Sequence, residues 1–171
     1  VTIDTAETAK SVATKINAVA GATAVLAQAR TTATLRSSSE TDLSYTIKIN
    51  DVETAAFDLS SAGVTDAVTK INAITTTTGV MAAATTDGRV RLIDVDGDDI
   101  TIENTSTQTT LFVGALENDG ATVAAGGGED NLAAAGGSDL TTISGSLRLT
   151  STTGFTVTQS ASTTSQKEES T

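Results

Sequence analysis

The chain of 171 residues contains no cysteine, proline, histidine or tryptophan, and its only aromatic residues are Tyr45, Phe57, Phe112 and Phe155. Without cysteine there are no disulfides and no thiolate chemistry, and without histidine the most common general base of enzymes is missing. Most of the apolar residues are Ala and Val, so the sequence predicts a thin, closely packed core. The abundance of Ser and Thr favours strands and polar turns over long helices.

Basic residues are also scarce, since 10 Lys and Arg stand against 21 Asp and Glu, which gives a formal net charge of −11. An excess of negative charge repels both a phosphate backbone and an anionic lipid surface. No apolar run approaches the ~20 residues of a membrane span, and the first residues lack the pattern of a signal peptide. We therefore expect neither nucleic acid nor membrane as a partner.

The most informative feature present is an internal repeat. Residues 14–19 (Thr-Lys-Ile-Asn-Ala-Val) return 55 positions later as residues 69–74 (Thr-Lys-Ile-Asn-Ala-Ile). Without a gap, the same shift aligns Val25 with Val80, Ala27 with Ala82, and Arg36 with Arg91. The sequence thus contains one structural unit twice, and the two copies should pack in equivalent ways.

Each copy begins with the apolar spacing of an amphipathic helix. The apolar residues are Ala9, Val12, Ala13, Ile16 and Val19 in the first copy and Val64, Ala67, Val68, Ile71 and Ile74 in the second. The pattern predicts helices over residues 5–20 and 64–74. Asp4 and Glu7 have the spacing of a capping box, and Gly21 suits a C-terminal cap.

Alternating apolar residues around turn-forming pairs predict three β-hairpins. Their turns are Asn50-Asp51, Asp87-Gly88 and residues 151–154, and their strands cover residues 45–49 with 52–57, 80–84 with 90–95, and 147–150 with 155–158. The Gly- and Ala-rich stretch from 114 to 137 is expected to form a long loop. The polar residues from 160 onward are expected to be a disordered linker.

These expectations amount to an α+β fold built from two related helix-plus-hairpin units with antiparallel sheets. The expected segments are a first unit at residues 1–60, a second unit at 61–110, a Gly- and Ala-rich excursion at 111–142, a closing hairpin at 143–158 and a tail at 159–171.

The repeated Lys-Ile-Asn-Ala motif, followed by residues 79–82 (Gly-Val-Met-Ala) and an Asp-Gly hairpin, resembles the "IN" motif of the variable central, outer region of bacterial flagellins. Residues 145–157 resemble the closing hairpin of that motif, so the likeness covers most of residues 5–110 and 143–158. The long heptad-patterned segments that build the core of flagellin filaments have no counterpart in this chain. The resemblance implies an outward-facing domain of a longer filament subunit.

On that resemblance, the expected function is structural: a surface-exposed part of the flagellar filament that contributes to motility and to its antigenic surface. The implied location is extracellular, after export without a cleaved signal peptide, and the implied partners are other flagellin subunits, bound through terminal regions absent from this chain. O-linked glycans on Ser or Thr are also compatible with the resemblance, which selects no particular residue.

Three carboxylates, Asp94, Asp96 and Asp98, are spaced as in calcium loops. An EF-hand starting at Asp94 would need Gly at its sixth position and Glu at its twelfth, where this chain has Asp99 and Thr105. A solvated turn between strands is the favoured interpretation, and these residues stay weak metal candidates.

Lys15, Ile16, Asn17, Lys70, Ile71 and Asn72 recur as the repeat motif, and we interpret them as scaffold. Asn near a helix end serves capping, Lys complements the C-terminal helix dipole, and Ile belongs to the apolar face. Asp66 with Lys70 and Glu7 with Lys10 are expected to form exposed helix ion pairs.

We expect no enzyme and no cofactor, because the Ser residues lie in polar turns with no recognisable base. Two other functions stay open. A hook-associated capping or junction protein carries similar units, and an extracellular adhesin or carbohydrate-binding module is often a Thr-rich, acidic β-domain. The few aromatic residues argue against sugar binding.

Overall fold

A computed structural model describes residues 1–4, 6–117, 128–137 and 139–158. It contains helices and antiparallel strands, with strands predominating, so the expected α+β class is confirmed at this level. In chain order the elements are α1 (Ala9–Asn17), α2 (Ala20–Thr23), β1 (Val25–Ser37), β2 (Leu43–Tyr45), β3 (Ile47–Ile49), β4 (Val52–Glu53), β5 (Phe57–Leu59), α3 (Thr65–Asn72), α4 (Thr75–Thr78), β6 (Val80–Ala84), β7 (Val90–Asp94), β8 (Ile100–Asn104), β9 (Leu111–Ala115), β10 (Glu129–Leu132), β11 (Leu140–Ile143) and β12 (Ser146–Ser151).

Both predicted helices are present but shorter than expected, and each is followed by a separate short helix, α2 or α4. The cap predicted for the first helix is wrong, because Thr8 is the N-cap and its hydroxyl accepts a hydrogen bond from the Ser11 amide. The Asp4 amide does donate to Glu7, at 3.4 Å, but this contact precedes the helix. Gly21 lies inside α2, and the left-handed residue that ends α2 is Ala24.

Within the described residues the strands form three antiparallel sheets. One has the order β10-β9-β1-β7-β6, with β12 also paired to β1, the second has the order β11-β8-β3-β4, and the third is β2-β5. The sheets combine strands from the segments 1–60, 61–110, 111–142 and 143–158. In one sheet β3 and β11 both pair with β8, and in another β12 pairs with β1. Strand pairing therefore joins parts of the chain that are distant in sequence.

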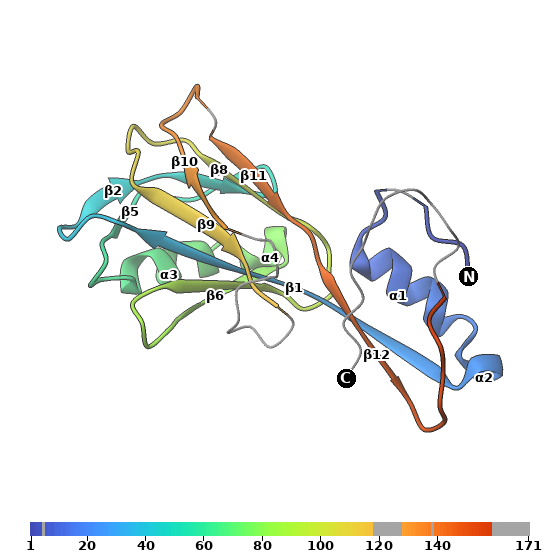
Figure 1. The fold of residues 1–171 in the computed structure, drawn as a ribbon. Helices are drawn as coiled ribbons and strands as arrows, with labels where there is room; N and C mark the ends of the chain where they lie inside the picture. Colours follow the sequence, from blue (N-terminus) through green and yellow to red (C-terminus); the bar gives the residue numbers. More distant parts are fainter. Residues whose placement is uncertain (5, 118–127, 138, 159–171) are drawn as a thin grey trace.

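The strand β1 is long enough to belong to two parts of the molecule. Its residues from Thr31 onward pair with β7 and β9, whereas Val25 to Arg30 pair with β12. Figure 1 shows β1 and β12 leaving the larger part together and reaching a smaller part that carries α1 and α2. We name residues 1–30 and 146–158 the N-terminal lobe and the remaining described residues the body.

Two of the three predicted hairpins are confirmed. Strands β6 and β7 pair across the Asp87-Gly88 turn, and β3 and β4 pair across Asn50 and Asp51. Both Asn50 and Asp51 have positive φ angles, as a tight two-residue hairpin turn requires. Outside that turn, Tyr45 and Phe57 pair in the small sheet β2-β5, and their rings stack.

The third hairpin, predicted at 143–158, is wrong. Leu147 to Thr150 lie in β12, but their partner is β1, and residues 155–158 form no strand. The expected long loop from 114 to 137 is also interrupted, because Glu129 to Leu132 form β10 beside β9. Residues 118–127 and the predicted disordered tail from 159 onward lie outside the described residues.

Two apolar clusters differ strongly in size. The large cluster lies in the body and draws on both extended sheets, the small sheet and α3; its fully buried members include Leu35, Tyr45, Ile47, Ile49, Phe57, Leu59, Ile71, Leu92, Ile100, Ile102 and Leu111. The small cluster, in the N-terminal lobe, contains Ala9, Ala13, Ala27 and Ala29, with Ile16 and Leu149 only partly buried. The lobe therefore has much less apolar packing to stabilise it.

Candidate functional site

The repeated asparagines make the same contact in both copies of the motif. The Asn17 side-chain amide donates to the Ala27 carbonyl oxygen at 2.8 Å, and the Ala27 amide donates to the Asn17 side-chain oxygen at 2.8 Å. The corresponding distances between Asn72 and Ala82 are 2.9 and 2.8 Å. A carboxamide carries one donor and one acceptor side, so it can bind a peptide unit as another strand would.

This asparagine contact joins the last residue of a helix to the strand that follows it. Asn17 ends α1 and Asn72 ends α3, and the short helices α2 and α4 carry the chain back to β1 and β6. Each side of the carboxamide thus has one backbone partner in both copies, as a scaffold role requires. We call this two-bond contact the asparagine clamp.

The lysine and isoleucine of the motif have different environments in the two copies. Ile71 is fully buried, whereas Ile16 is only partly buried at the edge of the small cluster. Lys15 forms an ion pair with Glu7 and lies 3.6 Å from Asp4. The Lys15 ammonium lowers the pKa of the Glu7 carboxyl, and Glu7 raises the pKa of Lys15.

Neither ion pair expected on the helix surfaces is formed. Glu7 binds Lys15 rather than Lys10, and the Asp66 carboxylate accepts a hydrogen bond from the backbone amide of Asp58 at 3.0 Å. Asp66 therefore attaches α3 to β5. The expectation failed because other partners lie closer: Glu7 meets Lys15 of α1, Lys10 meets Asp96 and Asp98 of the turn after β7, and Asp66 meets the backbone of β5.

The carboxylate of Asp94 organises a turn. Its Oδ1 atom accepts hydrogen bonds from the amides of Asp96, Gly97 and Asp98 at 2.9 to 3.4 Å. Lys10 of the N-terminal lobe forms ion pairs with the other two carboxylates of this turn. Its Nζ atom lies 3.3 Å from the Asp96 carboxylate and 2.7 Å from the Asp98 carboxylate. Among the described residues, no group of three or more acidic side chains is placed to hold a metal ion.

The same turn is where the lobe meets the body. The Lys10 amide of the lobe donates to the Gly97 carbonyl oxygen at 3.0 Å. Within the body, the hydroxyl of Thr31, the first residue of β1 beyond the lobe, donates to the Asp98 carbonyl oxygen at 2.6 Å. A Cβ added to Gly97 would lie 2.4 Å from the Ala29 Cβ, and one added to Gly145 would lie 2.8 Å from the Ala9 Cβ. Glycine is therefore needed at this junction for the backbones to approach closely.

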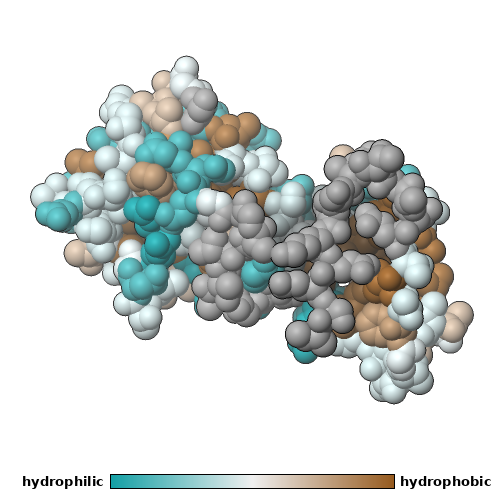
Figure 2. All heavy atoms as spheres, viewed as in Figure 1, coloured by the Kyte–Doolittle hydropathy of each residue, from teal (hydrophilic) through white to brown (hydrophobic). Residues whose placement is uncertain are grey.

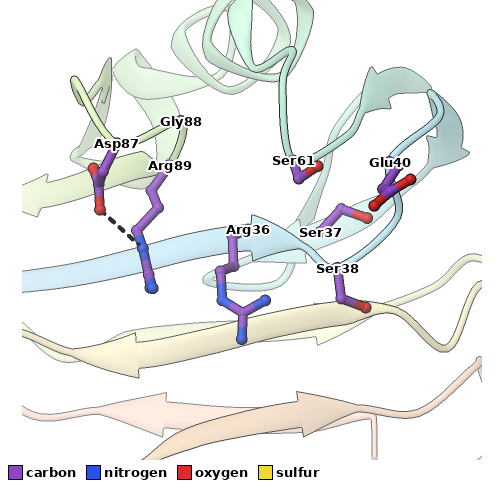
Figure 3. Close-up of a pocket in the computed structure, with 8 residues that line it drawn as sticks. All are labelled: Arg36, Ser37, Ser38, Glu40, Ser61, Asp87, Gly88 and Arg89. Carbon is purple, nitrogen blue, oxygen red and sulfur yellow. Dashed lines mark ion pairs between the residues drawn. The ribbon is translucent and has the colours of Figure 1, made fainter.

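A polar cleft of about 370 Å³ lies at the far end of β1. Its lining residues are Arg36, Ser37, Ser38, Glu40, Ser61, Asp87, Gly88 and Arg89. Figure 3 shows Arg36 and Arg89 extending over the sheet in the same direction, with Arg89 bound to Asp87. The remaining side chains are short hydroxyls and one carboxylate, Glu40.

Both arginines of the cleft are held by Glu129 of β10. Arg36 donates to both carboxylate oxygens of Glu129 through two nitrogens at 2.5 to 3.0 Å, and Arg89 donates to Oε1 of the same carboxylate. The Arg36 guanidinium also lies 4.3 Å from the centre of the Phe112 ring. Arg36, with help from Arg89, lowers the pKa of the half-buried Glu129 against the opposing effect of burial.

This arrangement leaves the cleft with little free charge for an anionic ligand, because its two cations already share one carboxylate. It contains no histidine or cysteine, and its Ser hydroxyls have no recognisable general base. The Glu129 network was missed in the sequence because Glu129 lies in a stretch expected to be a loop. Only the pairing of β10 with β9 brings Glu129 beside Arg36.

Comparison of the chain with protein-family models and with curated proteins found no match. The helices that the structure describes are too short or too polar to cross a membrane.

Proposed function

We propose that this chain is a structural domain made of two related units, each a helix clamped by asparagine to a two-stranded antiparallel element. The first unit comprises α1, α2, the first half of β1, and β12. The second comprises α3, α4, β6 and β7. In this proposal β12, rather than a local hairpin, completes the first unit.

The observation that carries this proposal is the asparagine clamp, which recurs with the same atoms and nearly the same distances in both copies. The strand pairs support it further, because Ala27 lies opposite Leu149 as Ala82 lies opposite Leu92. The sequence Leu147-Arg148-Leu149 of β12 also parallels Val90-Arg91-Leu92 of β7. In both units the side chain of the repeated asparagine therefore binds the backbone of its own unit.

The turns that follow these strands support the same alignment. After β7, the Asp94 carboxylate accepts a hydrogen bond from the Asp96 amide, two residues later. After β12, the Ser151 hydroxyl accepts one from the Thr153 amide, again two residues later. Gly97 and Gly154 then occupy matching positions three residues beyond Asp94 and Ser151.

The particular structural role that we propose is the outer domain of a flagellin, the subunit of the bacterial flagellar filament. The support is the resemblance of the repeat to the flagellin IN motif, together with the acidic, hydroxyl-rich composition. Net negative charge makes neighbouring copies on a filament surface repel one another and stay hydrated. Polymerisation and export would depend on terminal regions of a longer subunit.

The two alternative roles, a hook-associated protein and an adhesin, would place the chain elsewhere on the cell. A hook-associated capping or junction protein would use the same scaffold at one position on the filament. An adhesin would need a ligand surface, and the cleft is a weak candidate because its lining contains no aromatic residue and both of its arginines are bound by Glu129. We therefore place the filament role first.

Immunogold labelling of intact cells with an antibody raised against this chain tests the filament role. Label along whole filaments is expected for a flagellin outer domain. Label restricted to filament tips or to the hook junction would assign the hook-associated role instead, and label on the cell wall would favour an adhesin. Cells that carry a deletion of the parent gene provide the control for antibody specificity.

A further inference from the structure

Most arginines of the chain gather on one face of the sheet β10-β9-β1-β7-β6. Leu35 of β1 and Leu92 of β7 belong to the large apolar cluster, and alternate residues of a strand point to opposite faces. The even-numbered residues of β1 and the odd-numbered residues of β7 therefore share the outer face, as the pairing of Thr34 with Arg91 requires. We call this outer face the arginine face. Its arginines are Arg30 and Arg36 of β1, Arg91 of β7, and Arg89 directly before β7.

The arginine face contrasts with the charge of the whole molecule, because it holds four of the five arginines of a chain with a net charge of −11. Figure 2 shows hydrophilic residues gathered over the part of the body that contains β9 and β10, and Figure 3 shows Arg36 and Arg89 extending over the sheet. The carboxylate of Glu129 accepts hydrogen bonds from both of these arginines. Its negative charge is thus already shared by two guanidiniums.

The other two arginines, Arg30 and Arg91, have no acidic partner within the residues that the structure describes. Each side chain is partly buried, and its Nε atom is buried without a hydrogen-bond partner. Two guanidiniums of the arginine face therefore have no group that offsets their charge.

Two threonine hydroxyls on the same face are in the same situation. Thr32 and Thr34 are each 3% exposed, and in the described part of the chain neither hydroxyl has a hydrogen-bond partner. Of the five buried side-chain atoms there that lack a partner, four lie on the arginine face, and the fifth is Oδ1 of Asp99. A buried donor without an acceptor is unfavourable and uncommon. Water can accept from the hydroxyls, but it brings no charge to offset the guanidiniums.

The spacing of these four residues suits a tetrahedral oxyanion. Thr32 and Thr34 are two residues apart on one strand, so they lie about 6.6 Å apart, and Arg91 lies about 5 Å across from Thr34. Arg30 precedes Thr32 by two residues on the same face, and its side chain is long enough to reach the same region. Two hydroxyls and two guanidinium forks match the four oxygens and the double negative charge of phosphate or sulfate.

The surroundings restrict the ligand to a small anion. Ile93, which lies opposite Thr32, is 8% exposed and gives the region an apolar side. On the other flank Glu129 lies over Gly114 of β9, and both of its oxygens already accept hydrogen bonds. The net charge of −11 repels an extended polyanion, whereas salt confines the attraction of the arginines to about 8 Å.

We propose that Arg30, Thr32, Thr34 and Arg91 form a binding site for a phosphate or sulfate dianion, free or as the terminal group of a small molecule. The two guanidiniums balance its charge, and the two hydroxyls donate hydrogen bonds to its oxygens. This inference goes beyond the structural role proposed above, and it depends neither on the two-unit arrangement nor on the filament role.

The test uses the full, isotope-labelled chain, with inorganic phosphate and sulfate as probes at slightly alkaline pH, where both are dianions. NMR follows the Nε–Hε signals of the arginines while sodium chloride keeps the ionic strength constant. We expect saturable shifts at Arg30 and Arg91. The shifts at Arg36 and Arg89 should be clearly smaller, because Glu129 binds their guanidiniums.

Two matched pairs of variants separate a built site from the general attraction of positive charge. Thr34→Val keeps the shape and every charge but removes one hydroxyl, and it should weaken phosphate binding at least about tenfold. Thr142→Val, at an exposed position of β11, is its control. Arg91→Gln should abolish binding, whereas Lys70→Gln on α3 removes the same charge and should leave binding unchanged.

Melting temperatures show that the variants still fold. The Thr34 hydroxyl has no partner among the described residues, so Thr34→Val should melt at the original temperature when phosphate is absent. Phosphate should raise the melting temperature of the original chain and of both controls, because a ligand of the folded state stabilises it. It should not raise that of Thr34→Val or Arg91→Gln by a comparable amount.

The remaining outcomes also decide the question. Equal shifts of all five arginines, or the same shifts with added sodium chloride alone, would show only screening and overturn the proposal. Unweakened binding by Thr34→Val would likewise show that charge acts without a built site. Acetate that binds as tightly as phosphate would replace the tetrahedral dianion by a carboxylate. Methyl phosphate that binds like inorganic phosphate would support an ester as the natural ligand, and its exclusion would support the free ion.

Discussion

The N-terminal lobe and the body contain the same sequence motif and the same asparagine clamp, but among the residues that the structure describes only the body surrounds the motif with a second layer of strands. Ile71 is fully buried beneath that layer, and Ile16, with identical neighbours in sequence, is partly exposed. The comparison shows that the motif determines how the end of the helix is hydrogen-bonded to the strand that follows. The stability of each copy depends on the other elements that cover this helix and strand.

The largest expected difference between the two parts is at the isoleucines. Ile71→Ala leaves a cavity in the body and should lower the free energy of unfolding by about 3–5 kcal/mol. Ile16→Ala, at a partly exposed site, should cost only about 1 kcal/mol. Urea unfolding followed by circular dichroism measures both values. Equal losses would show that the two motifs are equally supported.

The junction between the two parts should be the next most sensitive site. Gly97 has a φ angle of +82° and no room for a Cβ beside Ala29, so Gly97→Ala should destabilise the chain by about 2–3 kcal/mol. Gly21→Ala is the matched control, because a Cβ there meets nothing within 4 Å and Gly21 is helical. That control should stabilise by about 0.5 kcal/mol. Thermal unfolding measures both, and an unchanged Gly97→Ala melting temperature would contradict the close approach.

The asparagine clamps provide a direct comparison of the two copies. Asn72→Ala leaves the Ala82 amide without its side-chain partner and should cost about 1–3 kcal/mol in the body. Asn17→Ala should speed hydrogen exchange in α1 and β12 while leaving the body unchanged. Replacement by Asp is the control, since it retains the acceptor and loses the donor. Exchange that is faster throughout the molecule in Asn17→Ala would show that lobe and body unfold as one unit.

The smallest effect is expected at Glu129, which has no counterpart in the lobe. Its folded pKa lies below the ordinary value of 4.5, because Arg36 and Arg89 favour the carboxylate. The stabilisation is therefore complete above pH 4.5 and is lost as the pH falls through the folded pKa. At pH 7 Glu129→Gln should cost about 1 kcal/mol.

Melting temperatures between pH 7 and pH 3 test this assignment. The difference between the original chain and Glu129→Gln should shrink as the pH falls. A difference that stays constant with pH would show that the carboxylate charge of Glu129 does not contribute.

Local signals in the sequence predicted much of the fold. The apolar spacing located α1 and α3, and the pairs Asn50-Asp51 and Asp87-Gly88 located two hairpins, because a helix face and a tight turn depend on residues close in sequence. The N-terminus of α1 was misplaced because Asp4 and Glu7 have the spacing of a capping box, whereas Thr8 forms the cap.

Long-range pairing could not be predicted in this way. Residues 147–158 contain two alternating stretches around a turn, which locally favour a hairpin, but β12 instead pairs with β1 more than 100 residues earlier. Glu129 likewise forms ion pairs with Arg36 and Arg89, which lie far away in the sequence, and no local sequence pattern predicts these pairs. The positions of the two arginines in the polar cleft depend on this contact with Glu129.

The continuous strand β1 has a consequence for how the molecule would carry tension. It is hydrogen-bonded to β12 over its first half and to β7 and β9 over its second half, all of them antiparallel to it (Figure 1). A force that pulls the lobe away along β1 acts parallel to these strands. Several hydrogen bonds must then yield together in shear, instead of opening one after another as in a zipper. The lobe is thus weakly packed but strongly tethered.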